Sequence, residues 1–233
     1  MTNPLPDKPL VPVCSSGETC RLNDELERLQ QQVQQLSELV SLDPLTHLFN
    51  YRHFSHVLAQ EMERSQRTQQ ATTLIMIDID HFKQVNDTWG HEIGNQALKM
   101  VAKCLLSSVR KLDITCRYGG EEFAIILPST EIMTGAKVAE RIRENIANTP
   151  LTIYQNQANE ADISLTVSLG LSMYTGSRQE TAATIIASAD GQLYQAKQQG
   201  RNQVSVCVPD TKEQQVNYDE KAALFDMFKP SEE

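Results

Sequence analysis

The most regular hydrophobic pattern of the chain lies near its start, between residues 22 and 42. Apolar side chains recur there at alternating steps of four and three, at Leu22, Leu26, Leu29, Val33, Leu36 and Val40. This strict repeat predicts the a/d seam of a coiled coil, because a helix packed on its own domain usually carries a wider apolar stripe. We therefore favour a dimerisation helix over residues 22–42. Such a short helix should associate weakly.

From residue 43 to residue 208 the pattern predicts one compact α/β (α+β) domain. Apolar residues at helical spacing predict helices over residues 47–69, 93–111, 129–146 and 181–199. Apolar runs predict strands over residues 73–79, 114–118, 123–127 and 165–173. The resulting βαββαβ order predicts a palm-like, antiparallel-type sheet with helices on one or both faces.

Composition narrows the classes of function. Residues 1–21 predict a disordered leader and residues 209–233 a charged tail. A formal net charge of −9 argues against nucleic acid as a partner. No stretch approaches the roughly 18–20 apolar residues that span a bilayer, so we expect no membrane segment and a cytoplasmic location. Five scattered cysteines suit reduced thiols in that compartment.

Two pairs of carboxylates carry the candidate chemistry. Asp78 and Asp80 come at the end of an apolar strand, and strand alternation places them on one side. Glu121 and Glu122 follow Gly119-Gly120 at a hairpin tip, where missing side chains let a ligand approach the backbone. Clustered carboxylates without a basic partner indicate a hard cation, Mg²⁺ or Mn²⁺. A solvated acidic turn is the alternative.

The same residues resemble the signature of the GGDEF family, here Arg117-Tyr118-Gly119-Gly120-Glu121-Glu122-Phe123. The resemblance extends over roughly residues 43 to 206, in the family's order and spacing. It includes Asp43-Pro44-Leu45-Thr46, Asp78-Ile79-Asp80-His81-Phe82-Lys83, Asn86-Asp87, Gly90-His91, Val167-Ser168-Leu169-Gly170, Ala189-Asp190 and Gly200-Arg201-Asn202. The family's members are diguanylate cyclases, which join two GTP molecules into cyclic di-GMP.

The resemblance implies a metal centre. Asp78, Glu121 and the main-chain carbonyl of Ile79 match the family's ligands for two Mg²⁺ ions. Those ions would neutralise the triphosphate and activate the attacking 3′-hydroxyl. Glu122 is the candidate for assisting deprotonation.

The resemblance also implies a GTP site. Phosphate contacts fall on Lys83, Lys197 and Arg201, on backbone N–H groups near His81 and Phe82, and at the turn of Gly119 and Gly120. Asn86 matches the residue that contacts the guanine edge. Asn95 departs from the family's usual aspartate, which would accept from guanine N1–H and N2–H₂. Either Asn95 turns its oxygen toward guanine and little changes, or guanine preference weakens.

Two smaller departures lie near the start of the domain. His47 stands where the family commonly has glycine, and Tyr51 where it commonly has arginine. They leave the implied metal site untouched but question the local turn and a polar contact.

Five residues separate Gly119 from a second motif, the RxxD sequence Arg110-Lys111-Leu112-Asp113. By resemblance this is an inhibitory site for cyclic di-GMP, with Arg141 as an additional contact. Arginine forks would hold the product's guanines and phosphates. Taken alone, the motif is more typical of a capping or surface ion pair.

The sequence thus predicts a metal-dependent diguanylate cyclase that works as a homodimer, each domain binding one GTP. Two alternatives remain. One is a non-catalytic receptor that binds cyclic di-GMP through the RxxD site. The other is a cyclase that makes a mixed adenine-guanine cyclic dinucleotide, motivated by Asn95.

Overall fold

The computed structural model describes residues 25–30, 41–156, 159–177 and 179–206 of the chain. The described residues from 42 onward belong to one compact unit, and residues 25–30 to another. The elements of the larger unit are β1 (Phe49–Asn50), α2 (Tyr51–Thr68), β2 (Thr72–Ile79), α3 (Phe82–Trp89), α4 (His91–Ser107), β3 (Ile114–Gly119), β4 (Glu122–Leu127), α5 (Ile132–Ala147), β5 (Leu151–Asn156), β6 (Asn159–Ile163), β7 (Val167–Tyr174), α6 (Ala182–Gln198) and β8 (Val204–Val206).

The main sheet has six strands in the order β1-β3-β4-β2-β7-β8. Its four inner strands pair antiparallel, as predicted. The two edge strands pair parallel, β1 with β3 and β8 with β7, so the sheet is mixed rather than antiparallel throughout. These edges have two and three residues, too few for any periodicity to show in the sequence.

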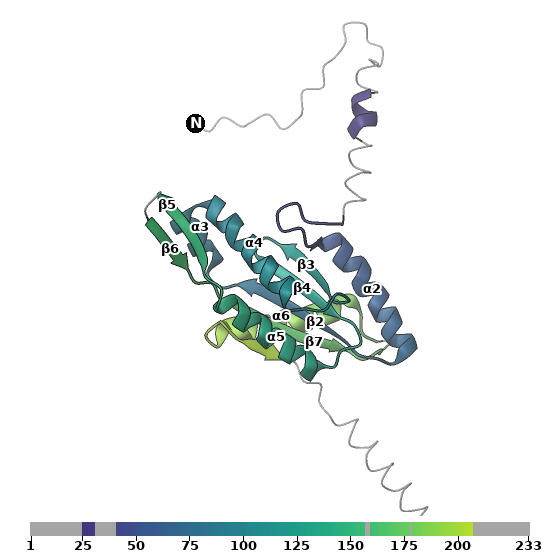
Figure 1. Ribbon diagram of the computed structural model, residues 1–233. Coiled ribbons are helices and arrows are strands. Elements are labelled where there is room, and N and C mark those ends of the chain that lie inside the picture. Colours follow the sequence, from purple (N-terminus) through teal and green to yellow (C-terminus); the bar gives the residue numbers. More distant parts are fainter. Residues whose placement is uncertain (1–24, 31–40, 157–158, 178, 207–233) are drawn as a thin grey trace, which may run out of the picture. The chain divides into compact units, whose positions relative to one another are not determined.

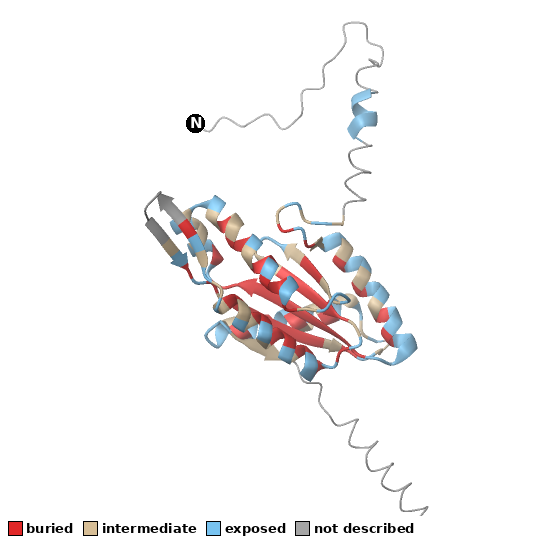
Figure 2. Ribbon diagram, in the orientation of Figure 1, coloured by how far each residue is buried: buried red, intermediate tan, exposed pale blue. Residues whose placement is uncertain are grey.

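Helices cover both faces of the sheet (Figure 1). One core lies between the sheet and α4 and α5, and contains Ile75, Ile77 and Ile125. The other lies between the sheet and α2 and α6, and contains Leu74 and Met76. Neighbouring residues of β2 thus enter opposite cores, and the whole strand is buried (Figure 2). Burial on both sides explains why β2 is a continuous apolar run instead of an alternating one.

The helix predicted from residue 47 begins at Tyr51 instead. Asp43 Oδ1 accepts hydrogen bonds from the N–H and hydroxyl of Thr46, which closes a turn before the helix. His47 adopts a left-handed φ of 59° in this turn, a conformation that glycine would adopt more readily. Asn50 then caps α2 by accepting from the His53 N–H.

Apart from β1, four further elements were not predicted: α3, the two strands β5 and β6 of a hairpin, and β8. Phe82, Val85 and Trp89 lie at helical spacing in α3, but the helix has only eight residues, too few for periodicity to identify it. The helix predicted over residues 93–111 is α4, which begins earlier and ends earlier.

The smaller unit is described for residues 25–30, which are helical. Leu26 and Leu29 are 49% and 47% exposed there. The other seam positions, the leader and the tail lie outside the described residues, so the coiled coil stays a prediction. Among the helices that the structure describes, none is long and apolar enough to traverse a bilayer.

Candidate functional site

The candidate site lies where β2 ends beside the β3–β4 hairpin. Asp78 and Glu122 are opposite one another in the antiparallel pair of β2 and β4. One residue further on, the Ile79 N–H donates to the Glu121 carbonyl at 3.4 Å. The fold therefore brings together the two acidic pairs, whose members lie 41 to 44 positions apart in the sequence.

The double glycine shapes the tip of that hairpin. Gly120 has a φ of 51°, a conformation that costs glycine little, and the register shifts between Arg117 and Gly119. A Cβ placed on Gly119 or Gly120 would meet nothing within 4 Å. The space in front of this turn is open, as close approach of a ligand to the backbone requires.

Asp78 has a basic partner that the sequence pattern did not indicate. Its carboxylate lies 2.9 Å from Lys197 Nζ, on α6, and the residue is 9% exposed. Burial raises the pKa of Asp78, and the charges of Glu121 and Asp80 add to that effect, while Lys197 opposes it. One lysine therefore does not balance the negative charge at this end of β2.

Glu122 has an electrostatic environment similar to that of Asp78. Its pKa is raised by burial, and then by the charges of Asp78, Asp190 and Glu121, with Lys197 acting against them. Asp190, on α6, also has a raised pKa, caused by burial and reduced by Lys197. The charge of Lys197 thus partly offsets that of several carboxylates at once.

The residues present fit a hard divalent cation. Asp78 and Glu121 offer carboxylate oxygens, and Ile79 offers a carbonyl, all at one end of β2. Among the described residues, no three His, Cys, Asp or Glu side chains converge as a metal-binding group. Mg²⁺ suits such a site, because it is usually held by one or two carboxylates together with water and substrate phosphates.

We expected Asp80 to share a cation with Asp78, but protein hydrogen bonds hold its carboxylate instead. Its two carboxylate oxygens accept from the hydroxyls of Thr166 and Ser168, each at 2.7 Å, and from the Asn202 N–H at 2.9 Å. These bonds satisfy the buried charge without a cation. They join the end of β2 to the start of β7 and to the loop after α6.

That loop carries Arg201, one of the expected phosphate contacts. Gly200, Arg201 and Asn202 all have positive φ, so the backbone turns sharply after α6. The bond from Asn202 to Asp80 fixes this turn near β2. Asp80 is therefore a positioning residue for Arg201.

The remaining expected substrate contacts lie on α3 and α4. His81 precedes α3 in a left-handed conformation, and no side chain caps the helix, so the first N–H groups at Phe82 and Lys83 face outward from the helix end. Such an end attracts phosphate. Lys83 is exposed on the first turn.

Gly94 determines the position of Asn86, the expected guanine contact, and sequence reasoning missed it. A Cβ on Gly94 would collide with Asn86 Oδ1 and come 3.4 Å from the Phe82 ring. The Asn86 side chain therefore lies directly over the α4 backbone at Gly94. Asn95 is the next residue of α4, so both expected guanine contacts lie where α3 meets α4.

Arg117 ties the hairpin to the turn before α2. Its Nη1 lies 3.2 Å from both carboxylate oxygens of Asp43, and its Nε donates to the Gly120 carbonyl at 3.0 Å. Although burial favours protonation, hydrogen bonds from Thr46 and the charge of Arg117 hold the pKa of Asp43 below its usual value. Asp43, in the turn before α2, is thus connected to the glycine turn through the side chain of Arg117.

Tyr51 makes an aromatic contact with the hairpin. Its ring meets the Tyr118 ring edge-on at 5.0 Å. Burial, followed by the Tyr51 and Asp190 neighbours, raises the pKa of Tyr118 to about 12.

The RxxD motif forms the turn between α4 and β3. The Arg110 N–H donates to Asp113 Oδ2 at 2.8 Å, and the Asp113 N–H donates to the Arg110 carbonyl at 3.1 Å. Arg141, on α5, donates from Nε and Nη2 to the Ser108 carbonyl at the end of α4. The three residues are thus arranged around one helix end.

Comparison with known proteins identifies the family to which this chain is similar. Residues 40–203 match the family described as "Diguanylate cyclase, GGDEF domain". The chain is 38% identical over 167 residues to the response regulator PleD of Caulobacter vibrioides, covering 72% of this chain and 36% of PleD. It is 37% identical over 167 residues to diguanylate cyclase DosC of Escherichia coli, covering 72% of this chain and 35% of DosC. The chain thus spans about a third of the length of these relatives.

Solved structures agree. The coiled coil and GGDEF domain of DgcB from Caulobacter crescentus, in complex with c-di-GMP, matches with a TM-score of 0.68 and 31% identity. That match covers 80% of this chain and 97% of the other. Diguanylate cyclase SiaD of Pseudomonas aeruginosa, in complex with its activator SiaC, matches with a TM-score of 0.67 and 34% identity, covering 80% and 70%. With this sequence match, this fold and these carboxylates at the glycine turn, the chain belongs to the GGDEF-domain family of diguanylate cyclases.

Proposed function

We propose that the chain is a diguanylate cyclase that condenses two GTP molecules into cyclic di-GMP and two pyrophosphates. The observation that carries the proposal is the meeting of Asp78, Glu121, Glu122 and Lys197 at the open glycine turn. A receptor that only bound the product would have no need to hold several carboxylates, two of them with raised pKa, around one lysine.

Each residue has a defined part in this reaction. Asp78, Glu121 and the Ile79 carbonyl would hold Mg²⁺, or Mn²⁺, which supplies charge neutralisation of the phosphates and a more acidic 3′-hydroxyl. Lys83, Arg201 and the first N–H groups of α3 bind the β- and γ-phosphates. Lys197, whose Nζ lies 2.9 Å from Asp78, would contact the same phosphates. Glu122, with its raised pKa, accepts the proton of the hydroxyl.

Formation of two phosphodiester bonds requires two such domains facing each other. Each 3′-hydroxyl attacks the α-phosphate of the GTP in the partner domain, and pyrophosphate leaves. In this proposal residues 43–208 are the catalytic domain, and residues 22–42 raise the local concentration of the second copy as a homodimeric coiled coil.

Product inhibition follows from the RxxD turn. The Arg110 side chain is exposed, and within the described part of the chain no hydrogen bond or ion pair engages its guanidinium. Arg110, Asp113 and Arg141 would hold cyclic di-GMP and keep the two active sites apart.

The decisive experiment is product analysis by mass spectrometry after incubation with Mg²⁺ and an equal mixture of GTP and ATP. Cyclic di-GMP alone, absent with Glu121→Ala, is the expected result. If the wild type forms no product but still binds cyclic di-GMP, the chain is a receptor and not a cyclase.

The same experiment decides the role of Asn95. Asparagine offers one carbonyl oxygen where aspartate would offer two acceptors to guanine, so a loss of about 1–3 kcal/mol in guanine preference is the alternative. A mixed adenine-guanine dinucleotide that disappears with Asn95→Asp would identify Asn95 as the specificity determinant.

A further inference from the structure

The loop after α6 presents Arg201, the proposed contact for the β- and γ-phosphates, on an unusual backbone. Arg201 and Asn202 are consecutive non-glycine residues with left-handed φ values of 63° and 46°. Asparagine adopts this conformation more readily than arginine does. Such a backbone persists only where surrounding contacts hold it, and it is concentrated at functional sites. The contacts that hold this loop therefore determine where the Arg201 side chain begins.

Two of these contacts hold the main chain. The Arg201 N–H donates to the Ala196 carbonyl at 3.0 Å, and the Asn202 N–H donates to Asp80 Oδ2 at 2.9 Å. A third contact holds a side chain and comes from another helix, since Arg143 Nη1, on α5, donates to Asn202 Oδ1 at 2.9 Å. Arg143 and Asn202 lie 59 positions apart in the sequence. The fold thus connects α5 to the loop through one guanidinium.

Glu140 sets the direction of the Arg143 guanidinium. Both carboxylate oxygens of Glu140 accept from Arg143 Nε at 3.0 Å, and one of them also accepts from Nη2 at 2.6 Å. These bonds occupy one side of the planar fork and leave Nη1 for Asn202. Glu144 lies a further 3.9 Å from Nη2, so two carboxylates compensate the charge of Arg143. Arg143 therefore acts on the loop through a directed hydrogen bond and not by attracting phosphate.

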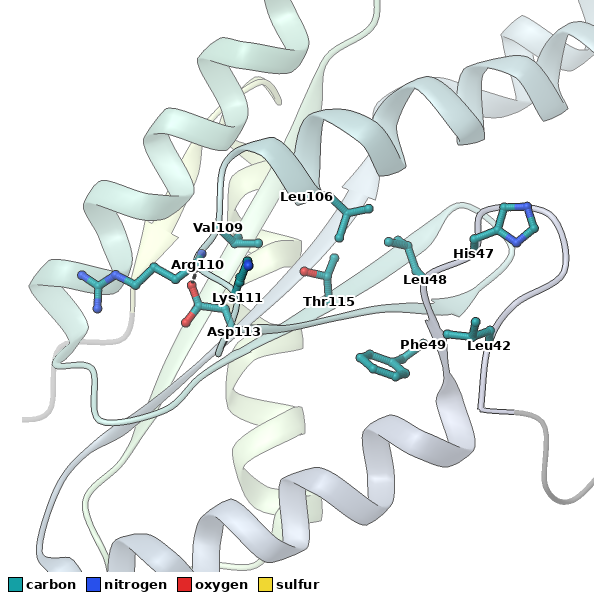
Figure 3. A pocket seen from close by; sticks show the side chains of 10 residues that line it. All are labelled: Leu42, His47, Leu48, Phe49, Leu106, Val109, Arg110, Lys111, Asp113 and Thr115. Atoms are coloured by element: carbon teal, nitrogen blue, oxygen red, sulfur yellow. Dashed lines mark hydrogen bonds between the residues drawn. The ribbon is translucent and has the colours of Figure 1, made fainter.

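Two other arginines show how Arg143 differs from a surface pair and from a ligand contact. Arg64 pairs with Glu61 on α2 at 3.4 Å, and its side chain is 51% exposed, compared with 19% for Arg143. Arg110 is the opposite case: its guanidinium extends away from Asp113, and its main-chain N–H donates to that carboxylate (Figure 3). The fork of Arg143, by contrast, is engaged within the protein by residues of two elements.

We propose that Arg143 is a positioning residue for the phosphate-binding loop, which holds Asn202 so that Arg201, one residue earlier, meets the β- and γ-phosphates of GTP. This inference rests on the proposed function, because it takes Arg201 as a phosphate contact. Arg143 acts through Asn202 and does not contact the substrate itself. The preference for a nucleoside triphosphate over a monophosphate is therefore set in part from α5, a helix that carries none of the proposed GTP contacts.

The test compares Arg143→Met with Arg64→Met. Each substitution removes an arginine from an i, i+3 pair with glutamate and leaves an unbranched side chain that favours a helix, but of the two arginines Arg143 is the one bonded to the loop. We expect Arg143→Met to raise the KM for GTP about five-fold with kcat changed less than about two-fold, and Arg64→Met to change neither. The inhibition constant of GMP, which lacks the β- and γ-phosphates, should be the same in both variants.

A double-mutant cycle tests whether Arg143 acts through Asn202. Asn202→Gly removes the acceptor for Arg143, keeps the N–H that donates to Asp80, and suits the positive φ. Arg143→Met should therefore add little to the KM of the Asn202→Gly protein. Additive increases in KM would show that Arg143 acts by another route and would overturn the proposal.

Hydrogen exchange of the nucleotide-free protein gives a readout that does not depend on turnover. The amides of residues 201 and 202 should exchange about five-fold faster in Arg143→Met than in the wild type, and at the wild-type rate in Arg64→Met. Unchanged exchange in Arg143→Met, or GMP inhibition weakened as much as GTP binding, would contradict the positioning role. If exchange changes as expected but the wild type forms no product, Arg143 still holds the loop and the cyclase assignment alone fails.

Discussion

At the scale of single residues, Gly94 determines where the Asn86 side chain can lie. A methyl group at this position would occupy the place of Asn86 Oδ1. We predict that Gly94→Ala displaces Asn86, costs about 1–3 kcal/mol of guanine recognition and raises the KM for GTP by about ten-fold or more. Steady-state kinetics at saturating metal measure this, and kcat should change much less.

The matched control for Gly94 is the same substitution in an Asn86→Ala background. The collision is then absent, so Gly94→Ala should add little to the effect of Asn86→Ala. Additive increases in KM would show that Gly94 acts in some way other than through Asn86.

Asp43 gives a prediction about pH. Its lowered pKa means that the ionised form stabilises the folded state above the unfolded value of 3.8, and that this contribution is lost as the pH falls through the folded value. Asp43→Asn keeps an acceptor for Thr46 but removes the charge beside Arg117. We expect a loss of about 1 kcal/mol at pH 7. In thermal melts, a Tm difference that does not shrink below pH 3.8 would contradict this account.

At the scale of elements, the close packing of α6 on β7 places Lys197 beside Asp78. Gly170 permits it, because a Cβ there would overlap the backbone of Ala189 and Leu193. We predict that Gly170→Ala moves α6 off the sheet, costs about 3 kcal/mol of stability and lowers the Tm by several degrees. Activity should fall more than the Tm change explains, since Lys197 moves with the helix.

Gly191 provides the control on the same helix. Nothing lies within 4 Å of a Cβ built on it, so Gly191→Ala should be neutral or stabilise the protein by up to about 1 kcal/mol. Calorimetric melts of both variants separate a packing effect from a general effect of changing glycine.

At the scale of the whole molecule, the proposed catalysis by two facing domains predicts that activity depends on protein concentration. Leu26 and Leu29 are about half exposed in the single chain, which leaves them free to pack against a second copy. We predict that Leu26→Glu with Leu29→Glu lowers specific activity at nanomolar concentration by ten-fold or more, and that raising the protein concentration restores it. Sedimentation should show a matching shift to monomer.

Glu27→Gln, on the same helix between the two seam positions, should leave both the activity and the sedimentation unchanged. If the double variant were as active as the wild type at every concentration, residues 22–42 would not be the dimerisation element.

The sequence by itself determined the inner sheet and the four long helices, and it predicted the carboxylates of the candidate site. Long apolar runs and helical periodicity carry enough residues to be specific, and the glycine-flanked carboxylates occur at family spacing. The short elements β1, β8 and α3 were not predicted for the opposite reason: they have two, three and eight residues, too few for a period to be specific.

Tertiary structure alone decided which charges are paired. The sequence placed Asp78 and Asp80 together as an unpartnered acidic pair, but folding brings Lys197 from α6 to the first and Thr166, Ser168 and Asn202 to the second. It also decided that Gly94 lies under Asn86 and that the buried Thr115 hydroxyl has no hydrogen-bond partner among the described residues. Such facts depend on contacts between residues far apart along the chain, which local propensity and spacing do not encode.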